Sequence, residues 1–146
     1  MEAHNLDFYE EPVPCDWYEE TKQVTDALNV PIAGGEQEPS MHQLRWLIAN
    51  DALDIVQPDV INVGGISEMR NVAMTANMMG IQVNPHVWGS SIMIAASLHV
   101  ASTIPPCPPS GNPEAFIQEP VMEFDRTPSD IRDELCSEPF DLIDGC

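Results

Sequence analysis

Short β-type runs alternate with helical patterns four times in succession between residues 6 and 103. The four runs are LDFYEE, PIAGGE, DIVQPD and IQVNPH, at residues 6–11, 31–36, 54–59 and 81–86. Strands that alternate with helices pair in parallel, because each helix carries the chain back to the starting edge of the sheet. The sequence therefore predicts an α/β fold with a parallel sheet.

Capping signals mark where the predicted helices begin. Two pairs have the spacing of a capping box: Asp16 with Glu19, and Ser40 with Gln43. We predict that Ser67 caps a third helix, which Gly80 ends and which turns Met69, Val72, Ala73 and Ala76 to one face. The fourth helix, at residues 90–103, is apolar almost all round, so we expect it to be deeply packed.

The composition changes at Pro105, where a proline-rich segment begins. One more β-like run, AFIQEPVMEF, follows at residues 115–124, and the chain beyond Arg126 is polar and acidic. We therefore divide the chain into a strand-and-helix domain at residues 1–125 and an acidic C-terminal tail at residues 126–146.

The chain carries 24 acidic and 5 basic residues, a net charge of −19. This charge repels phosphate groups, which argues against nucleic acid and anionic membrane surfaces as partners. No apolar run reaches the roughly 20 residues of a membrane helix, and residues 1–30 lack the order of a signal peptide. The four cysteines form no CxxC pair, which favours free thiols. We expect a cytoplasmic protein.

Each of the four β-type runs ends on an ionisable side chain. These residues are Glu10 or Glu11, Glu36, Asp59 and His86. Parallel strands share a direction, so their carboxyl ends meet at one rim, where (β/α)₈ barrels build their active sites. One polar strand end is explained by the chain leaving the core. Four ionisable residues at the same position of successive β-type runs favour a functional site.

The residue types at this rim suggest a chemistry. Carboxylates on adjacent strands, without a neighbouring Lys or Arg, repel one another unless a divalent cation lies between them, and an all-oxygen shell favours Mg²⁺. His86 has no second His or Cys at a ligand spacing, so we interpret it as an acid/base group. Asp59, one strand earlier, would hold the imidazole in the useful tautomer and stabilise the imidazolium.

Several motifs now carry a family resemblance: FYEEP at 8–12, GGE at 34–36, QPD at 57–59, GG at 64–65 and PHVWGS at 85–90. Their order, residue types and spacing resemble the mandelate racemase/muconate lactonizing enzyme family, the mandelate racemase subgroup of the enolase superfamily. The resemblance covers about residues 6–125 of this chain, which resemble the C-terminal barrel portion of the family. It implies a partial (β/α)₈ TIM-type barrel with about the last five of the eight strands.

The resemblance also implies a role for single residues. Glu10 resembles the second of three metal ligands and Glu36 the third, with Glu11 as a neighbour. Asp59 and His86 resemble the His-Asp dyad of the family. A final-strand glutamate hydrogen-bonds the substrate carboxylate in such enzymes; we assign this role to Glu123, with Glu119 as the alternative.

By resemblance the chain is a lyase or isomerase, and a His base with Mg²⁺ would support an ene-diolate. The implied substrate is a small carboxylate, a sugar acid or lactone, and the reaction a dehydration or cycloisomerisation. Racemisation or epimerisation is the alternative within the family. We expect the full-length enzyme to be a homo-oligomer.

The family's N-terminal capping domain, second-strand lysines and third-strand metal-binding Asp have no counterpart in residues 1–5. We therefore expect the chain to be the C-terminal part of a longer enzyme and to be inactive alone. Two further hypotheses stay open: a truncated, non-catalytic fragment, and an acidic module that binds divalent ions without chemistry.

Overall fold

The computed structural model describes residue 4, residues 6–107, residues 121–138 and residue 140. Within these residues, short strands form one parallel sheet in the order β1-β2-β3-β4. The strands are β1 (Tyr9–Glu10), β2 (Ile32–Gly34), β3 (Ile55–Val56) and β4 (Gln82–Val83). Strands that are neighbours in the sheet are also neighbours in the sequence, as successive βα units require. The predicted α/β class with a parallel sheet is confirmed.

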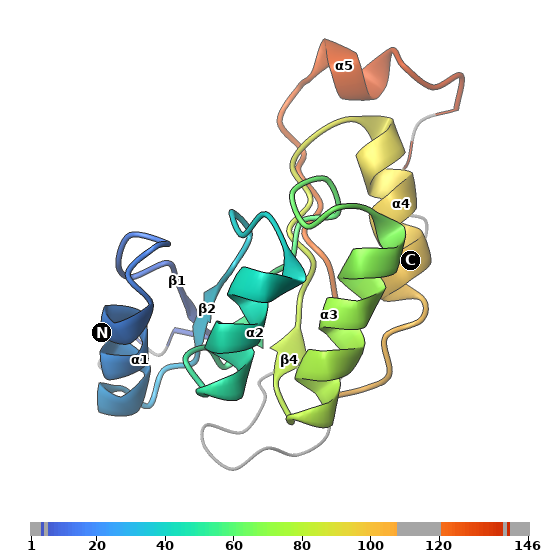
Figure 1. Ribbon diagram of the computed structural model, residues 1–146. Helices are drawn as coiled ribbons and strands as arrows, with labels where there is room; N and C mark the ends of the chain where they lie inside the picture. Colours follow the sequence, from blue (N-terminus) through green and yellow to red (C-terminus); the bar gives the residue numbers. More distant parts are fainter. Residues whose placement is uncertain (1–3, 5, 108–120, 139, 141–146) are drawn as a thin grey trace.

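Helices connect successive strands, and others follow β4 in the described part of the chain. They are α1 (Tyr18–Ala27), α2 (Met41–Ala49), α3 (Ile66–Met78), α4 (Ser91–Ala101) and the short α5 (Asp130–Asp133). The first four follow one another across the molecule, α2 packs against α3, and α3 packs against α4 (Figure 1). Among the described residues, no helix is long and apolar enough to cross a membrane.

The core lies between the sheet and α2 and α3. Its fully buried side chains come from the strands and from one stripe of each helix, and they include Ile32, Leu44, Ile48, Val56, Met69 and Val72. The predicted apolar face of α3 is buried, which confirms the helical periodicity. This core fixes the sheet as a rigid base for its carboxyl-end rim.

Two of the predicted helix starts are wrong. Asp16 does not cap α1; the N-cap is Trp17, whose carbonyl accepts hydrogen bonds from both the backbone N–H and the hydroxyl of Thr21. Ser67 does not cap α3; the chain enters this helix from Gly65 at φ 102°, a conformation that glycine adopts without strain. At α2 the prediction holds, because the Ser40 hydroxyl accepts from the backbone N–H of His42.

The expectation that α4 is deeply packed holds for one face of the helix only. Met93, Ile94 and Val100 are buried, whereas Ile92 is 66% and Leu98 is 42% exposed. A helix on the outside of a sheet presents one face to its neighbours, here to α3, so apolar residues on the other face remain in solvent.

The predicted fifth strand falls partly on residues outside the described ones. From residue 121 onward no strand is assigned in the described part of the chain, but the backbone N–H of Glu123 donates to the carbonyl of Pro85 at 3.1 Å. The segment therefore lies beside the end of β4. Helix α5 lies beyond residue 125 and contacts α4. The domain boundary at residue 125 stays a prediction.

Asp54 makes the stability of the fold depend on pH. Its carboxylate accepts a hydrogen bond from the backbone N–H of Ile32 at 2.8 Å, and burial raises its pKa to about 6. Because the ordinary pKa is 3.8, the folded state favours the protonated acid, and the free energy of unfolding should fall as pH rises from about 4 to about 6.

The expected fall is at most about 3 kcal/mol, from a pKa difference of about two units. Asp54→Asn keeps an acceptor oxygen for Ile32 but cannot ionise, so its unfolding free energy should be flatter across this range. Urea unfolding at pH 4, 5, 6 and 7 measures the difference. Equal pH dependence of the two proteins would contradict this role of Asp54.

Candidate active site at the carboxyl ends of the strands

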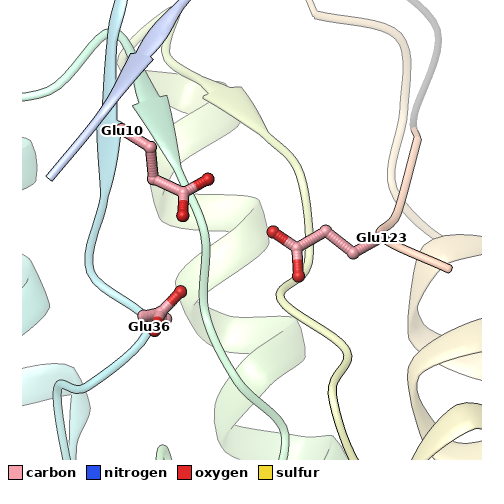
Figure 2. Close-up of side chains that lie close together, drawn as sticks. All are labelled: Glu10, Glu36 and Glu123. Carbon is pink, nitrogen blue, oxygen red and sulfur yellow. The ribbon is translucent and has the colours of Figure 1, made fainter. Parts of the chain in front are cut away.

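Acidic side chains from three separate segments meet at the carboxyl end of the sheet. Glu10 ends β1, Glu36 follows β2, and Glu123 comes from the segment beside the end of β4. One carboxylate oxygen of each lies within 4.8 Å of one oxygen of each of the others. The three carboxylates point toward one another (Figure 2), and we call them the carboxylate group.

Backbone pairing beyond the strands holds the rim residues in line. Asp59 and His86 form a parallel bridge, in which the backbone N–H of His86 donates to the carbonyl of Pro58 at 3.2 Å. The next segment repeats this pattern, because the N–H of Glu123 donates to the carbonyl of Pro85. The spacing between Asp59, His86 and Glu123 is therefore set by main-chain hydrogen bonds.

Glu10, the last residue of β1, and Glu11, which follows the strand, have different surroundings. Successive residues of a strand point to opposite faces, and Glu10 points into the carboxylate group. Glu11 has a positive φ of 40°, and one of its carboxylate oxygens accepts a hydrogen bond from Gln37 at 3.3 Å. Glu11 is thus outside the carboxylate group, although the sequence pattern alone left both glutamates possible.

His86 and Asp59 form a hydrogen-bonded pair. Nδ1 of His86 lies 2.9 Å from Oδ2 of Asp59, and Oδ1 of Asp59 accepts from the backbone N–H groups of Ile61 and Asn62 at 2.7 and 3.1 Å. Burial raises the pKa of Asp59, but these hydrogen bonds outweigh burial and lower the pKa below its ordinary value. Asp59 is therefore ionised, and Nδ1 of His86 carries the hydrogen between them.

The other ring nitrogen of His86 faces the carboxylate group. Nε2 lies 3.5 Å from Oε2 of Glu36 and 3.7 Å from Oε2 of Glu123. The hydrogen bond to Asp59 raises the pKa of His86; burial lowers it, and the charges of Glu123 and Glu36 raise it further. A cavity of about 550 Å³ lies beside His86, with walls that include Glu10, Glu36, Val87, Trp88 and Glu123. Nε2 is thus the ring atom available to a bound molecule.

The carboxylates carry unfavourable charge in this arrangement. Burial raises the pKa of Glu36, His86 opposes the rise, and the charges of Glu10 and Glu123 add to it. Burial also raises the pKa of Glu123, against the effects of His86 and of the N–H of Val87. Bringing a cation among these groups would relieve their repulsion.

The donor set of the carboxylate group fits a divalent cation. Mg²⁺ and Ca²⁺ take carboxylate oxygens, and opposite oxygens of an octahedral Mg²⁺ shell lie about 4.2 Å apart. Three oxygens cannot all be opposite one another, and adjacent oxygens of the shell lie about 3 Å apart, so oxygens within 4.8 Å of one another would have to approach by up to roughly 2 Å to share one cation. Glu10 and Glu36, the predicted ligands, are both members of the group.

Two features of this rim were not predicted. Glu123 joins the same group as the predicted metal ligands, whereas the sequence assigned it only to the substrate, and its alternative Glu119 lies outside the described residues. Gln57, whose amide contacts both Glu10 and Glu123, was missed. The signal was present in QPD, because residues two apart in a strand share a face and Asp59 was already assigned to the rim.

Comparisons with known proteins show which enzymes the chain resembles. The chain is 35% identical to D-galactarolactone cycloisomerase of Agrobacterium fabrum, over 96% of the chain and 36% of that enzyme. It is 30% identical to arabinonate dehydratase of Saccharolobus solfataricus, over 99% of the chain and 35% of that enzyme. The chain thus spans about a third of the length of these relatives.

Solved structures give the same relationship. The crystal structure of the 3,6-anhydro-D-galactonate cycloisomerase from Zobellia galactanivorans matches with a TM-score of 0.75 and 32% identity, over 92% of the chain and 34% of that protein. The enolase C-terminal domain-like family matches residues 1–146. The chain therefore belongs to the enolase C-terminal domain-like family and corresponds to the C-terminal barrel portion of mandelate racemase/muconate lactonizing enzyme-like members of the enolase superfamily.

Proposed function

We propose that these residues serve a Mg²⁺-dependent abstraction of the proton α to a carboxylate, on a sugar acid or a sugar-acid lactone. The observation that carries the proposal is the position of His86, with Nδ1 bonded to Asp59 and Nε2 facing the carboxylate group. The relatives support the substrate class, because they include a sugar-acid dehydratase and a cycloisomerase that acts on a sugar-acid lactone.

In this proposal Glu10 and Glu36 hold the cation through one oxygen each. When bound, Mg²⁺ would offset the second negative charge that develops on the substrate carboxylate. The cavity of about 550 Å³ beside these residues offers room for the substrate. Glu123 would hydrogen-bond the substrate carboxylate; burial raises its pKa above the ordinary value, which favours the protonated form that can donate this hydrogen bond.

His86 moves the proton. Neutral His86 accepts the α-proton at Nε2 while Nδ1 keeps its hydrogen toward Asp59, and the ionised Asp59 stabilises the resulting imidazolium. The same Nε2–H can then protonate a departing hydroxyl, which completes a dehydration, or a ring oxygen, which completes a cycloisomerisation. A racemase or epimerase would instead return a proton to the α-carbon. The products of the reaction therefore separate the alternatives.

The experiment that tests the proposal is exchange of the α-proton in deuterated buffer. The gene product that carries these residues is incubated with Mg²⁺ and a panel of aldonic and aldaric acids and their lactones. We expect deuterium at the α-position of substrate or product, loss of exchange with a chelator, and recovery with added Mg²⁺. Residues 1–146 alone, run in parallel, should show no exchange. Absence of exchange by the gene product with every compound would contradict the proposal.

A further inference from the structure

Gln57 is a buried amide that contacts two members of the carboxylate group. Its side chain is 1% exposed, and Nε2 donates to Oε2 of Glu10 at 3.0 Å and to Oε1 of Glu123 at 3.3 Å. An amide nitrogen carries two hydrogens, so each carboxylate receives one of them. One neutral side chain therefore connects the end of β1 to the segment beside β4.

The backbone holds Gln57 between these two glutamates. It directly follows β3, and its N–H donates to the carbonyl of Gly34 on β2 at 2.8 Å. Gln57 lies two residues before Asp59, so both side chains point to the same face of the sheet. The amide thus lies at the carboxyl end of β3 and contacts Glu10 and Glu123, which both line the cavity.

The surroundings fix the orientation of the amide. Among the described residues no group donates to Oε1 of Gln57, although this oxygen is buried. The opposite orientation would place Oε1 beside two carboxylates and would add repulsion to an already acidic site. Oε1 of Gln57 therefore stays buried without a donor among the described residues, while the two N–H groups of Nε2 reach Glu10 and Glu123.

The two glutamates need such a connection because they repel each other. Carboxylate oxygens of the two residues lie within 4.8 Å of each other, so an unbridged pair would move apart or turn away when both groups are ionised. The bridge uses Oε2 of Glu10 and Oε1 of Glu123, and Oε2 of Glu123 receives the backbone N–H of Val87 at 3.3 Å. Both oxygens of Glu123 are thereby oriented, and Oε1 of Glu10 takes no part in the bridge.

We propose that Gln57 is a positioning residue that sets the separation and orientation of the Glu10 and Glu123 carboxylates. Its effect on a bound metal rests on the proposed function, in which Glu10 is a ligand. The bridge itself concerns only protein groups and can be tested without metal.

The first test compares Gln57→Met with Gln82→Met by calorimetric titration with Mg²⁺. Gln82 is a matched control, because it is also a buried glutamine whose Oε1 receives no hydrogen bond from a described residue, but its Nε2 donates to Asn84 at 2.9 Å. We expect Gln57→Met to lower the Mg²⁺ affinity about 10- to 100-fold, as loss of a group that orients a metal ligand does. Gln82→Met should change it less than about twofold.

The second test uses the metal-free protein and the melting temperatures of Gln57→Met, Glu10→Gln and the double variant. Charge-assisted hydrogen bonds are about twice as strong as neutral ones, so Gln57→Met should lower the melting temperature more when Glu10 is present than when it is Gln. If Gln57→Met does not fold, Gln57→Asn replaces it in both tests, since its shorter side chain reaches only one of the two carboxylates.

The outcomes separate the bridge from the metal. Unchanged Mg²⁺ affinity in the Gln57 variant, with normal binding by the unaltered protein, would overturn the positioning role and leave the proposed function standing. If the unaltered protein binds no Mg²⁺, the metal part of the proposed function fails, and the melting temperatures alone test the Gln57 bridge. Additive shifts would then overturn the bridge, whereas coupled shifts would support it.

Discussion

His86→Asn should abolish turnover by the gene product while leaving Mg²⁺ affinity and melting temperature close to those of the unaltered protein. Asparagine can still donate a hydrogen bond toward Asp59, but it has no nitrogen that accepts a proton near neutral pH. General acid/base groups contribute about 10²- to 10⁴-fold to rate, and more where no other base replaces them. Steady-state kinetics, metal titration and thermal unfolding of the same preparation measure the three quantities.

Asp59→Asn provides the comparison for this result. The hydrogen bond to Asp59 is the largest of the effects that raise the pKa of His86, so its weakening should lower that pKa. Neutral His86 would then be available at lower pH, and the acidic limb of the pH–rate profile should move to lower pH, with a smaller rate loss than in His86→Asn. If His86→Asn unfolds the protein instead, the histidine is structural and the proposed role is wrong.

Glu36→Gln should weaken Mg²⁺ binding by at least about an order of magnitude, because one of the anionic ligands becomes a neutral amide. Isothermal titration calorimetry measures the affinity directly. Glu38→Gln is the matched control: Glu38 is two residues away and buried, but its carboxylate accepts a hydrogen bond from the Tyr18 hydroxyl at 2.6 Å, which an amide oxygen can also accept. Equal affinities of the two variants would remove Glu36 from the metal site.

The fold class and the meeting of Glu36, Asp59 and His86 were predictable because both follow from strand direction. Parallel strands bring their carboxyl ends together whatever the details of the helices between them. The choice between Glu10 and Glu11 needed the structure, since it depends on which residue of the strand turns inward. Two adjacent glutamates in a sequence do not reveal which of them faces the rim, and only the resemblance to a known family favoured Glu10.

The errors at the helices have a common physical origin. Ser67 and Asp16 are good capping residues, but the backbone turns before α3 and α1 settle where each helix begins. At α3 this turn uses Gly64 and Gly65, both with positive φ. The exposure of Ile92 on α4 was equally outside the reach of the pattern, because an apolar helix surface does not reveal which face a neighbour covers.

Both members of the proposed proton-transfer pair follow a buried proline, Pro58 before Asp59 and Pro85 before His86, and each proline carbonyl accepts the hydrogen bond that aligns the next segment. A proline ring fixes φ already in the unfolded chain. Pro58 and Pro85 therefore lose little backbone conformational entropy when the protein folds. The imidazole of His86 and the carboxylate of Asp59 are therefore aligned when the protein folds, before a substrate binds. The binding free energy of a substrate remains available for orienting the substrate itself.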